Sequence, residues 1–295
     1  MIILLTIFQY LVQATVDLMD KFLITARKIE PVSYTFFTVV TGMLLLVIWP
    51  WNFFALPANV IFLDILSGVF FSLTFYVFFV ALSQGEVSRV VPYVFGLVPV
   101  FDLLISLFTG KNVLSLNEVG AMCLLIPGAL FISYQPGNFW GKHVALKTFS
   151  AFLFSCYYSL WQLGSQTQHV LDNLMWNRLA AGAVLLILLL LPAFRKKVFA
   201  TQKLKNKTGT SALFLFKQLL GGVNFIFLSF LLALGNIAII NGLQGFRYVF
   251  LLLFSLLLSK KRSHLINEQF SRGAVWQKSF GIALVFLGTI LLFVK

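Results

Sequence analysis

The amino-acid sequence predicts an all-α, polytopic membrane protein with about ten transmembrane helices. Hydrophobic residues make up 60% of the chain and charged residues only 11%, whereas soluble domains carry about 25% charged residues. Apolar stretches follow one another along the chain, each near the roughly 20 helical residues that cross a hydrocarbon core about 30 Å thick. These runs are continuous and lack period-two alternation, which favours helices over a membrane β-barrel.

The expected spans are separated by short connections. Prolines mark several of their ends (Pro31, Pro50, Pro136 and Pro192), where they interrupt no helical hydrogen bond. The predicted spans cover residues 2–22, 32–50, 60–82, 86–108, 116–134, 146–168, 172–192, 211–234, 237–258 and 275–294.

The basic residues gather in connections on one side of these spans, which the positive-inside rule assigns to the cytoplasm. Loops 193–210 and 259–274 are therefore expected to be cytoplasmic, and ten spans would then leave both termini outside. The net charge of +13 could suggest a nucleic-acid partner. The placement of the basic residues in short connections argues against one. Tight loops without targeting signals are typical of a multi-pass protein of the bacterial inner membrane. The residues counted on that side are Lys21, Arg27, Lys28, Lys142, Lys147, Arg195, Lys196, Lys197, Lys203, Lys205, Lys207, Lys260, Lys261, Arg262, Arg272 and Lys278.

The two halves of the chain, 1–136 and 137–295, resemble each other. The segment GAMCLLIPGALFI (Gly120–Ile132) reads like GIALVFLGTILLF (Gly281–Phe293). Five spans in each half is an odd number, so the second copy would be inverted relative to the first. Inverted repeats are typical of alternating-access transporters, whose substrate binds near the midplane between the repeats.

The segments ALSQGEVSRVVPYVFGLVPVFDLLISLF (Ala81–Phe108) and LNEVGAMCLLIPGALFISY (Leu116–Tyr134) resemble the EamA family of the drug/metabolite transporter superfamily. The resemblance covers nearly the whole chain and implies ten helices in two five-helix repeats. The second half departs from the family pattern, because Leu251 stands where a proline would be expected. The family generally keeps both termini in the cytoplasm, which disagrees with the charge count above.

Polar residues on the first and sixth spans are candidates for a central cavity, since ionisable groups inside a bilayer are costly. Gln13 and Asp17 are four residues apart and share a helical face. Tyr158, Trp161 and Gln162 would face them from the sixth span. Interhelical hydrogen bonding is the alternative role for such amides. The neighbouring Asp20 and Lys21 are expected to be solvated at the membrane interface.

The fourth and ninth spans add cationic candidates. Arg89 and Tyr93 share one face of the fourth span, where snorkelling of Arg89 to the interface is the alternative. Arg247 lies near the middle of span 237–258 and is the strongest single candidate, with a structural ion pair to Asp102 as the competing interpretation. The candidate substrate-binding residues are Gln13, Asp17, Arg89, Tyr93, Tyr158, Trp161, Gln162, Asn241, Gln244 and Arg247.

Charges of both signs with amides and aromatic rings favour a secondary transporter of a small polar or zwitterionic, amino-acid-like metabolite. A proton or a sodium ion could couple to transport through Asp17. The alternative is a flippase or exporter of a lipid-linked or amphiphilic compound. Metalloprotease and nucleotide-binding motifs are absent from the sequence, so we expect no enzyme, no cofactor and no metal.

Overall fold

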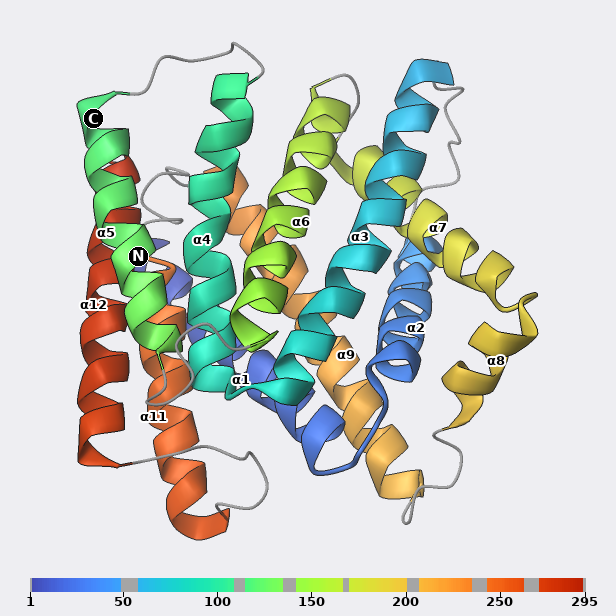
Figure 1. Ribbon diagram of the computed structural model, residues 1–295. Coiled ribbons are helices and arrows are strands. Elements are labelled where there is room, and N and C mark those ends of the chain that lie inside the picture. The colour runs from blue at the N-terminus through green and yellow to red at the C-terminus, as the bar shows by residue number, and fades with distance from the viewer. Residues whose placement is uncertain are drawn as a thin grey trace.

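A computed structural model shows an all-helical protein (Figure 1). The structure describes residues 2–48, 58–108, 115–134, 142–166, 170–200, 207–234, 243–262 and 271–293. Within these ranges the elements are α1 (Ile2–Thr25), α2 (Pro31–Gly42), the 3₁₀ helix η1 (Met43–Ile48), α3 (Ala58–Gln84), α4 (Val87–Phe108), α5 (Leu116–Ser133), α6 (Lys142–Ser165), α7 (Val170–Leu188), α8 (Pro192–Phe199), α9 (Lys207–Leu234), α11 (Gly245–Arg262) and α12 (Arg272–Phe293).

Six helices in the described ranges are long and apolar enough to cross a membrane: α1, α3, α4, α5, α9 and α12. A seventh crossing results if α7 and α8, which meet at a bend of 106°, form one broken span. The all-α prediction is thus confirmed for the described residues, and the long apolar helices are compatible with a multi-pass membrane protein. The remaining expected spans hold helices that are shorter, such as α2 with 12 residues, or more polar, such as α6, which begins at Lys142.

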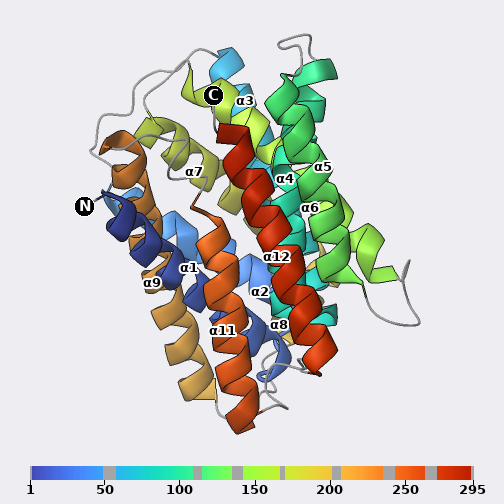
Figure 2. The same cartoon turned by 90° about the vertical axis from the view of Figure 1, so that its left-hand side faces the viewer.

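The helices pack side by side in one bundle (Figures 1 and 2). Helix α5 lies along α12, and α4 contacts both α5 and α6. Helix α3 packs on α6 and α7, while α1 packs on α9 and α11. Helices α1, α9 and α11 therefore form one group beside the α5–α12 pair, as Figure 2 shows.

Glycines explain the close approach of α5 and α12. A Cβ atom on Gly281 would lie 2.6 Å from Cγ1 of Ile132 and 3.0 Å from the carbonyl oxygen of Gly128. A Cβ atom on Gly128 would likewise lie 2.9 Å from Cβ of Leu284. Small residues let helix backbones approach closely in a membrane. The glycines that suggested a sequence repeat are thus packing residues of this interface.

The structure corrects the placement of three lysines that were assigned to connections. Lys21, Lys147 and Lys278 are 2%, 5% and 0% exposed, respectively, and lie inside helices. Each is close to the end of an apolar run, so the sequence does not distinguish a buried lysine from a loop lysine. The assignment of one side as the basic, cytoplasmic side therefore depends on fewer residues than the sequence suggested.

Two boundaries also differ from the predicted ones. Helix α8 (Pro192–Phe199) covers the first part of the expected loop 193–210, and its Arg195, Lys196 and Lys197 are exposed. Helix α11 begins at Gly245 rather than at residue 237. Arg247 therefore lies in the first turn of its helix, and residues 237–242 of the expected span lie outside the described residues.

Candidate functional site

Asp17 and Arg247 form a bidentate ion pair between α1 and α11. The Nε atom of Arg247 donates to Oδ2 of Asp17 at 2.7 Å, and Nη2 donates to Oδ1 at 2.9 Å. Both residues are buried, with 3% and 6% of their surface exposed. The planar guanidinium fork matches a carboxylate in this way, and such paired hydrogen bonds are among the strongest that proteins form. The expected alternative partner of Arg247, Asp102, instead accepts a hydrogen bond from Ser155.

Amide side chains extend this pair toward α9. Gln13 donates from Nε2 to Oδ1 of Asp17 at 3.2 Å, and Asn224 donates from Nδ2 to Oε1 of Gln13 at 2.8 Å. The guanidinium carbon of Arg247 lies 4.2 Å from the ring centre of Phe95 on α4. Four helices therefore contribute to one polar network in the interior of the bundle.

The predicted residues of α6 lie beside this network or outside it. Tyr158 is close enough to Arg247 to interact with its charge, and its side chain is 40% exposed. Trp161 is partly buried with no hydrogen-bond partner for Nε1, and Gln162 is exposed. Gln244 is partly buried in the turn before α11, whereas Asn241 lies outside the described residues.

Arg89 and Tyr93 belong to a second cluster near the first turns of α4. Nε of Arg89 pairs with Oε2 of Glu86 at 2.8 Å, and Nη1 donates to the carbonyl oxygens of Ile132 at 2.8 Å and Tyr134 at 2.7 Å. Arg89 thereby caps the C-terminal end of α5, where a cation is favoured by the helix dipole. It precedes Phe95 by six residues, about 9 Å along the helix axis.

The second cluster holds two further buried lysines. Nζ of Lys278 pairs with Oε2 of Glu86 at 2.5 Å. Lys147 bonds to Ser133 and lies 5.0 Å from the ring centre of Tyr93, whose hydroxyl shares a 2.7 Å hydrogen bond with Thr148. The groups of this cluster bond mainly to one another and to helix ends, so they hold α4, α5, α6 and α12 together.

A third polar cluster was not expected from the sequence. Asp20 is 5% exposed and pairs with Nζ of Lys217 at 2.6 Å. The hydroxyl of the fully buried Tyr34 also donates to Asp20. Lys21 donates to the carbonyl oxygens of Leu82 at 2.8 Å and Gly85 at 2.7 Å, which caps α3. The prediction that Asp20 and Lys21 are solvated at the interface is therefore wrong. The sequence signal for this cluster was Lys217, because a lysine within an apolar helix indicates a buried acidic partner.

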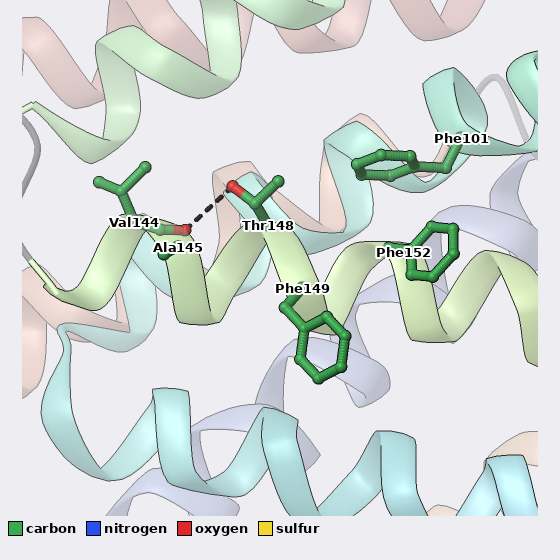
Figure 3. A pocket seen from close by; sticks show the side chains of 6 residues that line it. All are labelled: Phe101, Val144, Ala145, Thr148, Phe149 and Phe152. Atoms are coloured by element: carbon green, nitrogen blue, oxygen red, sulfur yellow. Dashed lines mark hydrogen bonds between the residues drawn. The ribbon is translucent and has the colours of Figure 1, made fainter.

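An apolar groove of about 480 Å³ lies between α4 and α6 (Figure 3). The phenyl rings of Phe101, Phe149 and Phe152 line it together with Val144, Ala145 and Thr148. Phe149 and Phe152 are 48% and 40% exposed, so this groove opens on the outside of the helix bundle. It is distinct from the Asp17–Arg247 network, whose charged groups do not line it.

Among the described residues, no group of three or more His, Cys, Asp or Glu side chains is arranged to hold a metal ion. The network is instead a set of charge-assisted hydrogen bonds between opposite charges and amides. Such groups can bind a carboxylate, an ammonium group or a proton when the pair between them opens.

No known protein family matches the chain, and no curated protein is significantly similar to it. Nine chains of solved structures match its fold. One, described as "Crystal structure of protein", is 16% identical in sequence and aligns over 98% of this chain and 96% of its own, with a TM-score of 0.50. At this identity the likeness concerns the fold alone.

Proposed function

We propose that this protein is a secondary transporter of a small polar or zwitterionic, amino-acid-like metabolite and works by alternating access. The observation that carries the proposal is the buried Asp17–Arg247 pair with its amide extension. Burying two charges is costly, and apolar residues of similar volume often stabilise a fold as well or better. A charge pair inside an apolar bundle is therefore a functional candidate.

The packing of the helices supports an arrangement of ten spans in two inverted repeats, 1–136 and 137–295. Helix α4 packs on α5 and α6, and α11 packs correspondingly on α12 and α1. Helix α3 packs on α6 as α9 packs on α1. Exchanging α1 with α6, α3 with α9, α4 with α11 and α5 with α12 preserves these contacts, as an approximate two-fold axis would require. The resemblance to the EamA family implies the same arrangement.

A zwitterion could replace both halves of the ion pair. Its carboxylate would accept from the Arg247 guanidinium, and its ammonium group would donate to Asp17, so that each buried charge keeps a partner. Opening the pair would loosen α11 from α1 and allow one repeat to move against the other. Binding of a proton or a sodium ion at Asp17 would favour the same opening and couple it to an ion gradient.

The exposed basic residues of α8, Arg195, Lys196 and Lys197, favour a cytoplasmic position for the connections 193–210 and 259–274. We place the protein in the cell membrane, as a multi-pass protein of the bacterial inner membrane with both termini outside. The proposed transport involves a soluble metabolite and the bilayer, with no nucleic acid, no cofactor and no enzymatic step.

The test is uptake of a radiolabelled amino-acid panel into proteoliposomes, with thermal-shift measurements on the same panel. We expect saturable uptake of at least one zwitterion by the wild type and none by Arg247→Ala. A ligand that stabilises the wild type but not the variant would locate binding at the pair. Absence of uptake and of stabilisation across the panel would contradict the proposal. Unchanged uptake after collapse of the pH gradient would exclude proton coupling.

The groove between α4 and α6 favours a second candidate function, the movement of a lipid-linked or amphiphilic compound. Its rings open on the outside of the bundle, where an acyl chain could lie. Thr148 in the groove bonds to Tyr93, which lies over Lys147, so polar groups adjoin the apolar surface. Stabilisation by lipids alone, with no response to soluble metabolites, would favour this second function.

A further inference from the structure

Arg178 on α7 is a partly buried arginine, and its surroundings differ from those of the buried Arg89 and Arg247. Its guanidinium carbon lies 4.1 Å from the ring centre of Phe71 on α3 and 5.8 Å from that of Phe225 on α9. On a third side, a Cβ atom added to Gly42 of α2 would lie 3.8 Å from Cδ of Arg178. The guanidinium therefore lies beside two aromatic rings, and the side chain passes close to the backbone of a glycine.

No acidic side chain among the described residues pairs with Arg178, and its buried Nε atom has no hydrogen-bond partner. Several buried cations of the bundle, in contrast, have oxygen acceptors. Arg247, Lys217 and Lys278 have carboxylates, and Lys21 has two carbonyl oxygens. Rings contribute attraction to a cation but accept no hydrogen bond in the plane of a guanidinium, so the Nε donor of Arg178 remains unused.

Intervening residues link Arg178 to the Asp17–Arg247 network. Phe225, which packs against Arg178, follows Asn224, which donates to Gln13. The ring of Phe71 lies 5.3 Å from that of Tyr157, next to Tyr158, which interacts with Arg247. Because Asp17 already neutralises Arg247, Arg178 supplies a positive charge in this part of the bundle that no acid of the described residues compensates.

We propose that Arg178 binds a carboxylate of the transported substrate other than the one held by Arg247, and that Phe71 and Phe225 contact the apolar or aromatic group attached to it. The inference rests on the proposed transport function and narrows its substrate to zwitterions that carry an additional carboxylate on an apolar or aromatic group. The Nε and Nη donors of Arg178 would bind the two carboxylate oxygens in the planar, bidentate geometry that a guanidinium favours. Lysine at this position would keep the charge but lose the fork.

Benzoate is a suitable probe, because it joins a carboxylate directly to an apolar ring, and benzamide is its neutral counterpart. Binding of both compounds is measured on the purified full-length chain in detergent by thermal shift and by titration calorimetry. The variants are Arg178→Gln, Arg178→Lys and, as a matched control, Arg195→Gln, whose arginine is exposed on α8. Gly42→Val is a further variant that fills the space beside Arg178 without removing its charge.

We expect saturable binding of benzoate, but not of benzamide, by the wild type and by Arg195→Gln. Affinity should fall about tenfold or more in Arg178→Gln, as expected for the loss of hydrogen bonds to a charged group. Arg178→Lys should be intermediate, and Gly42→Val should weaken binding even if Arg178→Gln does not fold. Equal benzoate binding by wild type and Arg178→Gln would overturn the proposal. Equal binding of benzamide and benzoate by the wild type, or no saturable response to benzoate, would do the same.

The failure of this inference can be told apart from the failure of the transport proposal. Benzoate binding that depends on Arg178, in a protein that transports no zwitterion into proteoliposomes, would support the carboxylate site and contradict the transport function. Saturable uptake that is the same in the wild type and Arg178→Gln would support the transport function and contradict the proposed role of Arg178.

Discussion

Arg247 and Asp17 are 230 residues apart in the sequence, and two hydrogen bonds of 2.7 and 2.9 Å join their side chains in the interior of the bundle. One comes from the first turn of α11 and the other from the C-terminal half of α1. Phe95 covers the guanidinium, and Gln13 supports the carboxylate. The pair links the first and last thirds of the chain, so any movement that separates α1 from α11 must exchange its hydrogen bonds.

Replacing one member of this pair should destabilise the protein far more than replacing both. Asp17→Leu or Arg247→Met leaves an uncompensated buried charge, and we expect each to lower the free energy of unfolding by about 3–5 kcal/mol. The double variant should lose clearly less than the sum of the two single losses. Chemical unfolding in detergent measures all three, with Arg195→Ala as an exposed control that should change stability by no more than about 0.5 kcal/mol. Additive losses would show that the two charges do not interact.

The Asp20 cluster predicts a graded response. Tyr34→Phe removes one hydrogen bond to a charged group that keeps Lys217, so we expect a loss of about 1.5–3 kcal/mol. Lys217→Met leaves the Asp20 carboxylate without its cation and should cost about 3–5 kcal/mol. Tyr76→Phe on α3, where the side chain is 39% exposed, is the control for Tyr34→Phe. Equal effects of the two tyrosine substitutions would contradict the hydrogen bond between Tyr34 and Asp20.

The sequence was sufficient to predict the helical structure with its long apolar helices, because a long apolar run has one favourable structure in lipid. It also identified Asp17 and Arg247 singly, since an isolated charge in an apolar run stands out. Their pairing was not predictable, because Asp102 was an equally suitable acid until the packing of α1 on α11 was known.

Lys21, Lys147 and Lys278 show the limit of reading charges near the ends of apolar runs. A lysine there can extend to water or turn inward to a helix end, and the sequence is the same in both cases. The outcome depends on whether a neighbouring helix presents acceptors, as the end of α3 does to Lys21. Arg178 was overlooked as a site for a related reason, because only the structure shows that it lies beside aromatic rings and pairs with no acid of the described residues.

The contact between α5 and α12 predicts opposite effects for two glycines of the same helix. Gly281→Ala would place a methyl group 2.6 Å from Ile132 and 3.0 Å from a carbonyl oxygen, so we expect overpacking that costs about 1–3 kcal/mol. At Gly273 nothing lies within 4 Å of an added Cβ atom, and alanine is the better helix former by about 1 kcal/mol. Gly273→Ala should therefore be neutral or stabilising. Thermal unfolding compares the two, and equal destabilisation would show that the glycines do not set the helix spacing.

The groove between α4 and α6 distinguishes the two candidate functions. Ala145 is exposed in the groove, so Ala145→Trp fills apolar space without touching the Asp17–Arg247 pair. If the protein carries soluble metabolites through its interior, this variant should keep wild-type uptake in proteoliposomes, while Asp17→Asn should lose it. Movement of a fluorescently labelled phospholipid is measured in the same vesicles. Lipid movement by the wild type that Ala145→Trp abolishes and Asp17→Asn leaves intact would contradict the metabolite transporter, because the groove and not the charged network would then be the path.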